Sequence, residues 1–140
     1  MPIDNIFGTT VDLLAKSIDL RSRSHTMISA NLANVETPNY TPTNLSFEDE
    51  LKGALKGKKA GTPAITHPKH IPLKGQGESI QQVQGIVIDT ASLSPGKDGN
   101  GVELEGEMSR MAENQIMYNA SIQILAKKFE GIKSAIRENK

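Results

Sequence analysis

Two stretches of this chain, one near each end, carry mostly apolar residues at alternating spacings of four and three. The C-terminal stretch has Leu104, Met108, Met111, Gln115, Tyr118, Ile122, Leu125, Phe129, Ile132 and Ile136. The N-terminal stretch has Val11, Leu14, Ile18, Arg21, His25, Ile28, Leu32 and Val35. This spacing places side chains on one helix face and is typical of a coiled-coil seam. The sequence therefore predicts a long helix at each end, with a matching seam on both.

The polar members of the two seams suggest how the helices pair. If the first helix ends near residue 35 and the last begins near residue 104, an antiparallel hairpin pairs positions whose numbers sum to roughly 140. That register sets His25 opposite Gln115 and Arg21 near Tyr118, so the polar members share one layer. Such a layer fixes the register at some cost in stability. The pattern leaves open whether the seams meet within one chain or between neighbouring molecules.

Local signals mark where these two helices begin and end. Thr9 or Thr10 is expected to cap the first helix, which should stop near Val35 because Pro38 has no amide hydrogen and restricts the residue before it. Asn100 is expected to cap the last helix. These signals give each terminal helix a defined start or stop.

The segment between the helices is rich in Pro, Gly and Thr. It predicts a short helix from Phe47 to Lys56 and a strand at Ile86 to Ile88. Four lysines lie on or just after that short helix: Lys52, Lys56, Lys58 and Lys59. They could form a binding patch, but a solvated face and turn is the favoured interpretation. From residue 60 to residue 101 the composition predicts extended pieces that become ordered against a partner.

The predicted fold is mainly α. The N- and C-terminal helices pack as an antiparallel coiled coil, with a short helix and an extended, partly β or disordered middle. Residues 1–40 form the N-terminal helix and the Asn/Thr-Pro elbow at its end (Ala30 to Tyr40), residues 41–101 the variable middle, and residues 102–140 the C-terminal coiled-coil helix. Residues 1–40 and 102–140 are expected to form one structural unit.

Composition excludes several classes of function. The 140 residues include 16 basic and 16 acidic side chains, so no net charge attracts nucleic acid or an anionic membrane. Only 36% of the residues are hydrophobic and 4% aromatic, which predicts a small core. The chain has no Cys, and therefore no disulfide, thiolate metal site or thiol nucleophile. We expect neither a cleavable signal peptide nor a membrane span.

One cluster invites an enzymatic interpretation. His67 and His70, with Glu78 nearby, have the chemistry to hold a zinc-bound water. Pro68 lies between the histidines in a segment without predicted regular structure, so ordinary loop histidines are the favoured interpretation. We therefore expect no catalytic residue, cofactor, metal or small-molecule substrate.

The end of the first helix carries the most specific signal, the segment ANLANVETPNY from Ala30 to Tyr40. Asn31 and Asn34 lie three apart on one helix face, directly before Thr37 and Pro38. Carboxamides are poor helix formers. At this place they can either cap the free carbonyls of the helix end or bind a neighbouring backbone.

This segment resembles the signature A-N-x-x-N-x-x-T-P-x-Y of flagellar basal-body rod proteins. The matching residues are Ala30, Asn31, Asn34, Thr37, Pro38 and Tyr40. Family members commonly have Gly where this chain has Asn39, and Asn tolerates the left-handed backbone of such a turn. Further stretches are similar to the proximal-rod member of the family: Leu45-Ser46-Phe47, Thr66 to Ile71, Asp98 to Glu105 and Ala112 to Gln115.

The resemblance implies a structural subunit of the proximal rod, which transmits torque from the membrane ring to the hook. It implies export as an unfolded chain through the flagellar type III apparatus and a place in the periplasm-spanning rod. Its partners would be other proximal rod subunits, the ring-to-rod adaptor and the membrane-ring protein, with no nucleic acid. The alternative is a soluble coiled-coil adaptor or export chaperone that does not join a filament.

Overall fold

The computed structural model describes residues 8–57, 79–90 and 97–138. Its elements in chain order are α1 (Thr9–Ala33), β1 (Thr43–Ser46), α2 (Glu48–Gly57), the 3-10 helix η2 (Ile80–Gln82), β2 (Ile86–Asp89) and α3 (Leu104–Glu138). The predicted mainly helical fold, with long terminal helices, a short helix and a small strand region, is confirmed. His67, His70, Glu78, Lys58 and Lys59 lie outside the described residues.

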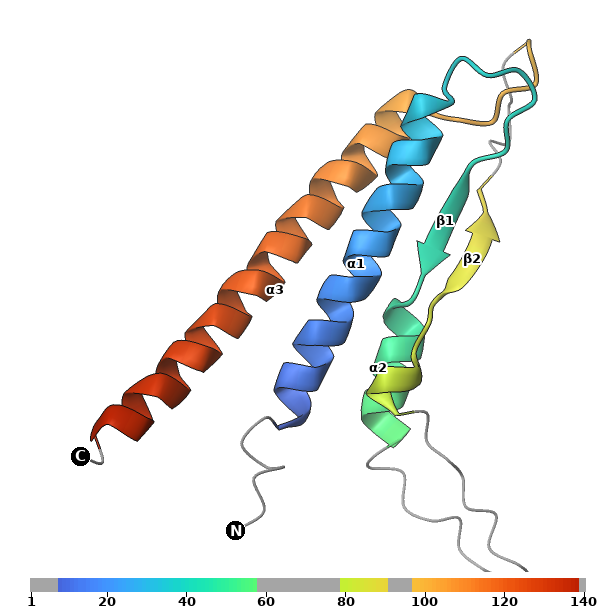
Figure 1. Ribbon diagram of the computed structural model, residues 1–140. Helices are drawn as coiled ribbons and strands as arrows, with labels where there is room; N and C mark the ends of the chain where they lie inside the picture. The colour runs from blue at the N-terminus through green and yellow to red at the C-terminus, as the bar shows by residue number, and fades with distance from the viewer. Residues whose placement is uncertain (1–7, 58–78, 91–96, 139–140) are drawn as a thin grey trace, which may run out of the picture.

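The long helix α1 lies between two neighbours (Figure 1). On one side α3 runs beside it in the opposite direction, and on the other side lie α2 and the two strands. Contacts link α1 to α3, to β1 and to η2. The elbow therefore joins α1 to both neighbours at one end of the molecule.

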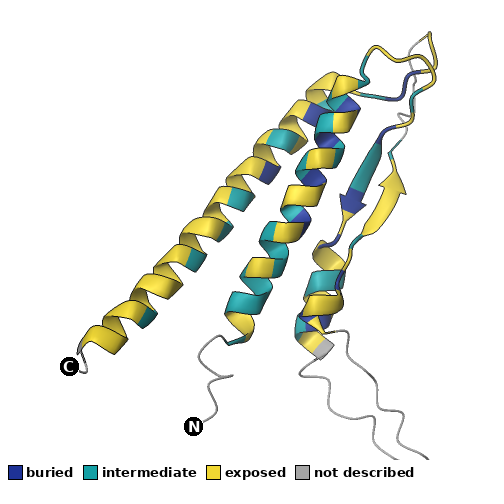
Figure 2. Ribbon diagram, in the orientation of Figure 1, coloured by how far each residue is buried: buried dark blue, intermediate teal, exposed yellow. Residues whose placement is uncertain are grey.

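The hydrophobic core lies between α1 and the middle segment. Its buried members are Leu20, Leu45, Phe47, Ala54, Ile80 and Val83. Leu13 and Met27 extend it along α1, and with Leu20 they form a second apolar series spaced by seven residues. In contrast, α3 is exposed over most of its surface (Figure 2). The described part of the middle therefore has a packed partner within the chain, namely α1.

The strands form a two-stranded antiparallel sheet in which Leu45 pairs with Val87 and Asn44 with Ile88. The prediction of a strand at Ile86 to Ile88 is confirmed, and β1 was not predicted. Leu45 is buried against the core, whereas all four residues of β2 are exposed. The sheet is thus anchored to α1 through β1.

Two predicted helix caps are wrong. The N-cap of α1 is Gly8, with no side-chain cap, because Thr9 and Thr10 already lie in the first turn. The α3 helix begins at Leu104, and Asn100 lies four residues earlier with a different role, described below. At the other end, α1 stops at Ala33, two residues before the predicted position.

Gly85 allows the chain to enter β2, and replacing it should destabilise the fold. Its φ is +72°, and an added Cβ would lie 3.0 Å from Leu45 Cδ1 and 3.2 Å from Phe47 Cβ. Gly85→Ala is therefore expected to lower the free energy of unfolding by about 2 kcal/mol, measured by urea denaturation. Gly53→Ala is the matched control, because α2 has open space there and should gain about 0.5 kcal/mol. Equal midpoints for Gly85→Ala and the unaltered chain would contradict this.

Candidate functional site

Asn31 is the centre of the elbow. Its side chain is fully buried. The Nδ2 group donates to the Thr43 carbonyl oxygen at 2.9 Å and to Glu107 Oε2 at 3.0 Å. Its Oδ1 accepts from the Thr43 amide at 3.1 Å and from the Tyr40 hydroxyl at 3.2 Å. One carboxamide therefore connects α1 to the start of β1 and to α3.

Asn34, by contrast, acts within the elbow itself. Its Nδ2 donates to the Ala30 carbonyl oxygen at 2.8 Å, and its Oδ1 accepts from the Thr37 hydroxyl at 3.1 Å. The Thr37 amide also donates to the Asn34 carbonyl oxygen at 3.0 Å. Pro38, which follows, is exposed. Of the two uses considered for these amides, Asn34 caps the helix end and Asn31 binds a neighbouring backbone.

Asn100 completes the end of α1 from a distant part of the sequence. Its buried Nδ2 lies within hydrogen-bonding distance of the carbonyl oxygens of Asn34 (2.9 Å), Val35 (2.8 Å) and Thr37 (2.8 Å). Its Oδ1 accepts from the Val102 amide at 2.7 Å. These carbonyls lie beyond the last turn of α1, outside its regular helical hydrogen bonds. Those of Asn34 and Thr37 also accept from backbone amides of the turn. Asn100 thus caps the end of α1 and does not cap α3.

Two backbone hydrogen bonds tie the elbow to the segment before α3. The Asn39 amide donates to the Asp98 carbonyl oxygen at 3.1 Å, and the Gly101 amide donates to the Tyr40 carbonyl oxygen at 3.0 Å. The φ of Asn39 is 57°, so the left-handed turn expected at this position is present. Gly99 also has a positive φ, and a Cβ there would lie 2.5 Å from Asn39 Oδ1. The segment that follows α1 and the segment that precedes α3 therefore pack against each other, and together they cap the end of α1.

Removing the Asn100 carboxamide should destabilise this cap. Asn100→Ala leaves three carbonyl oxygens without their shared donor, so we expect the free energy of unfolding to fall by about 2 kcal/mol. Asn119→Ala is a suitable control, because Asn119 is exposed on α3 and should change stability by less than about 0.5 kcal/mol. Urea denaturation followed by circular dichroism measures both. Indistinguishable variants would show that Asn100 does not hold the elbow.

Polar side chains occupy the contact between α1 and α3. Glu107 is 2% exposed and Asn114 is 6% exposed. The Asn114 Nδ2 donates to the Arg21 carbonyl oxygen at 2.9 Å, and Glu107 pairs with Arg110 as well as with Asn31. Hydrogen bonds therefore connect the two helices at two levels.

The predicted seam residues divide between this contact and the surface. In α1, Ile28 is buried, and the others are half-buried: Val11, Leu14, Ile18, Arg21, His25 and Leu32, with Val35 just beyond the helix. In α3, Met111, Tyr118, Leu125 and Ile132 are half-buried. The remaining α3 members are exposed: Leu104, Met108, Gln115, Ile122, Phe129 and Ile136. The buried Glu107 and Asn114 each lie one residue before an exposed member, because both find hydrogen-bond partners on α1.

The expected polar layer lies at a small cavity between the two helices. The cavity has a volume of about 180 Å³ and is lined by Arg21, His25, Gln115 and Tyr118, together with Ser22 and Asn114. The four polar seam members therefore line one cavity, and Gln115 among them is exposed. Sequence reasoning missed Asn114, which makes the direct hydrogen bond there.

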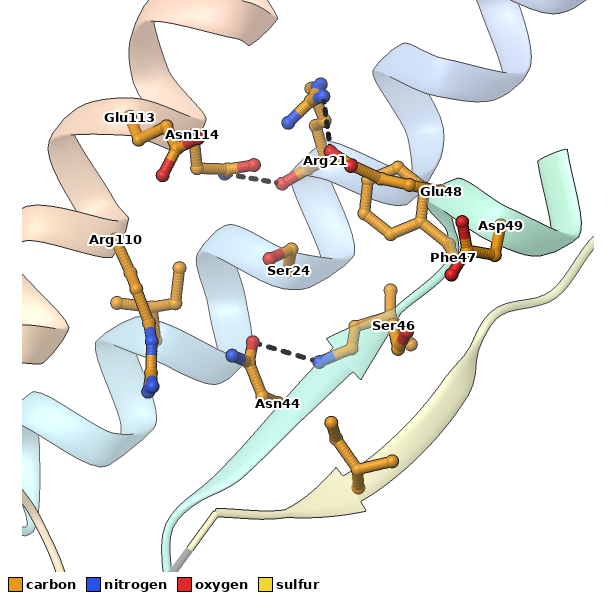
Figure 3. A pocket seen from close by; sticks show the side chains of 13 residues that line it. Arg21, Ser24, Asn44, Ser46, Phe47, Glu48, Asp49, Arg110, Glu113 and Asn114 are labelled. Atoms are coloured by element: carbon orange, nitrogen blue, oxygen red, sulfur yellow. Dashed lines mark hydrogen bonds and ion pairs between the residues drawn. The ribbon is translucent and has the colours of Figure 1, made fainter. Parts of the chain in front are cut away.

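A larger groove lies on the other side of this contact, between α1, α3 and β1 (Figure 3). Its volume is about 320 Å³. Arg21 lines it, with Nη2 3.3 Å from Glu48 Oε1 and the guanidinium carbon 5.4 Å from the Phe47 ring centroid. Arg110 and Glu113 line the α3 side. The groove is open and has many polar and charged side chains in its lining. The charge of Arg21 is already paired with Glu48.

Within the described residues, no three His, Asp or Glu side chains are arranged to hold a metal ion. In the same part of the chain, every helix is too short or too polar to cross a membrane.

The chain is similar to curated proteins named flagellar basal body rod protein FlgB. It is 30% identical to that of Borrelia hermsii over 135 residues, covering 95% of this chain and 99% of the relative. The identity to that of Cereibacter sphaeroides is 29% over 131 residues, with 94% and 96% covered. For Escherichia coli (strain K12) it is 26% over 126 residues, with 87% and 88% covered. No protein-family model matches the chain.

Proposed function

The chain belongs to the FlgB family of flagellar basal body rod proteins, and from this premise we propose that it is a structural subunit of the proximal rod. In this role it polymerises through its terminal helices and transmits torque from the membrane ring to the hook. The chain acts as a mechanical component and not as an enzyme. Its place is the periplasm-spanning rod of the basal body.

The exposed apolar stripe of α3 carries this proposal. Met108, Ile122, Phe129 and Ile136 are 58%, 41%, 44% and 68% exposed. Large apolar side chains that gather on one surface mark sites where another protein binds. A helical array of subunits buries such stripes through repeated head-to-tail contacts, which build a filament when the rotation does not close.

In the assembled rod, α1 and α3 act as an antiparallel coiled-coil pair. The heptad spacing of both helices and their opposite directions support this pairing (Figure 1). The hydrogen bonds from Asn31 to Glu107 and from Asn114 to Arg21 hold the register. Residues 1–40 and 102–140 then form one unit whose outer stripe contacts neighbouring subunits.

The partners of this subunit are other proximal rod subunits, the ring-to-rod adaptor and the membrane-ring protein. It reaches them through the flagellar type III export apparatus. The lack of Cys and the small core suit a chain that is exported unfolded and gains stability by packing with neighbours.

Charge placed on the α3 stripe should block assembly. Ile136→Asp puts a carboxylate into the proposed contact, so we expect at least a tenfold loss of this chain from isolated basal bodies, measured by immunoblot against the membrane-ring protein. Ile116→Asp is the control, because Ile116 is equally exposed at 67% but lies on another face of α3. Equal incorporation of the two variants would count against assembly through the stripe.

A further inference from the structure

The groove beside Arg21 is a surface that the fold itself does not fill. Its floor is Ser24 and Ile28 of α1, and its two walls are Asn44 and Ile88 of the sheet and Arg110 and Glu113 of α3. In Figure 3 the side chains of Asn44, Arg110 and Glu113 stand around the opening. Ile88 is 44% exposed, so the rim offers apolar surface as well as charge.

The charges of the groove leave it acidic. Arg21 is paired with Glu48, and Arg110 is paired with Glu107. Among the described residues, Glu113 has no ion-pair partner. The N-terminal half of α3, residues 104–118, which forms this wall, has three acidic residues and one basic residue.

The C-terminal half of α3 has the complementary character. Residues 119–138 include four basic residues and two acidic residues. Ile122, Phe129 and Ile136 repeat every seven residues on one exposed stripe, and Lys133 lies on the same stripe between the last two. A helix with this stripe brings apolar side chains and a lysine to the same surface.

The stripe and the groove lie on opposite sides of the contact between α1 and α3. Gln115, which continues the stripe toward the elbow, lines the small cavity on one side. Arg110 and Glu113 line the groove on the other side. A chain therefore cannot place its own stripe in its own groove, and a second molecule is needed.

We propose that the groove receives the C-terminal half of α3 from a second copy of this chain, with Lys133 of the incoming helix near Glu113. The inference rests on the proposed function, since it names the contact by which rod subunits join. Groove and stripe are different surfaces, so the contact is head-to-tail and leaves both ends of a pair free to continue.

Cross-linking in isolated basal bodies tests the contact. The chain has no Cys, so each engineered thiol is unique. Two differently sized tagged chains, one Glu113→Cys and the other Phe129→Cys or Ile136→Cys, the stripe positions on either side of Lys133, are expressed together, and the mixed disulfide dimer is quantified. The control replaces the stripe variant with Lys52→Cys, an exposed position on α2, and keeps Glu113→Cys as its partner. We expect one of the two stripe positions to give at least tenfold more mixed dimer than this control.

Charge reversal provides the second variant set. Glu113→Lys and Lys133→Glu should each reduce incorporation about tenfold, because like charges then face each other. The double variant, or an equal mixture of the two single variants, should restore incorporation. Incorporation of each single variant at the level of the unaltered chain would overturn the proposal.

The two tests also separate this inference from the proposed function. Cysteine variants that are present in rods but give no mixed dimer above the control would overturn the groove contact and leave the rod role intact. Absence of the unaltered chain from basal bodies would instead overturn the rod role and, with it, this inference.

Discussion

Asn31→Ala is expected to lower the free energy of unfolding by about 3 kcal/mol. The substitution leaves the Thr43 amide and carbonyl groups without their shared partner and removes a donor from the buried carboxylate of Glu107. Buried polar groups that lose a partner cost about 1–3 kcal/mol each, and charged groups cost more. Urea denaturation measures the loss. In cells, the same variant should be synthesised but fail to complete the rod.

Asn34→Ala is the matched control for this experiment. Asn34 belongs to the same signature, but among the residues that the structure describes its side chain bonds to Ala30 and Thr37, both within the elbow. We therefore expect a loss of about 1 kcal/mol and a weaker defect in rod completion. If Asn34→Ala were as destabilising as Asn31→Ala, the connection between α1, β1 and α3 would not be the main role of this signature.

Leu20→Ala should be the most destabilising change in the hydrophobic core, by about 3 kcal/mol. Leu20 is fully buried where α1 meets Leu45, Phe47 and Val83. Deleting a buried leucine side chain to alanine costs about 2–5 kcal/mol, because a cavity remains in the core. Denaturant unfolding gives the value. Hydrogen exchange should also show faster opening of β1 and β2, since this cluster holds β1 to α1 and β2 pairs with β1.

Ile116→Ala serves as the control for the core substitution. It removes a similar aliphatic side chain from an exposed position on α3, so stability should change by less than about 0.5 kcal/mol. A small effect of Leu20→Ala, comparable to that of Ile116→Ala, would mean that the middle segment does not pack on α1 in solution.

The two long helices could be predicted because their heptad spacing is long and regular. The short helix was also predicted, because Leu51, Ala54 and Leu55 recur at helical spacing after Phe47. The β2 strand was predicted from its three consecutive β-branched residues. The elbow could be found from Asn31, Asn34, Thr37, Pro38 and Tyr40 as a set. Local patterns of this kind depend on neighbouring residues alone.

The strand β1 was missed although Leu45 and Phe47 alternate with polar residues. Four residues are too short for that alternation to be distinctive. The core series of Leu13, Leu20 and Met27 was also missed, because the adjacent seam on α1 has the same spacing. Two apolar stripes on one helix indicate two neighbours, and here they are α3 and the middle segment.

The roles of Asn100, Glu107 and Asn114 depend on contacts that no local pattern contains. Asn100 caps a helix that ends more than sixty residues earlier in the sequence. Glu107 and Asn114 resemble surface residues of α3 until α1 supplies their partners. Only the arrangement of the elbow makes these polar side chains part of the interior.

The central claim is that this chain is a structural part of the rod, and deletion of its gene in a motile host tests it most directly. Basal bodies are isolated and imaged, and export of hook protein is scored. The account predicts membrane rings without rods and no exported hook protein, with both restored by the unaltered chain. Complete rods and swimming cells would contradict it and would favour the alternative, a soluble coiled-coil adaptor or export chaperone.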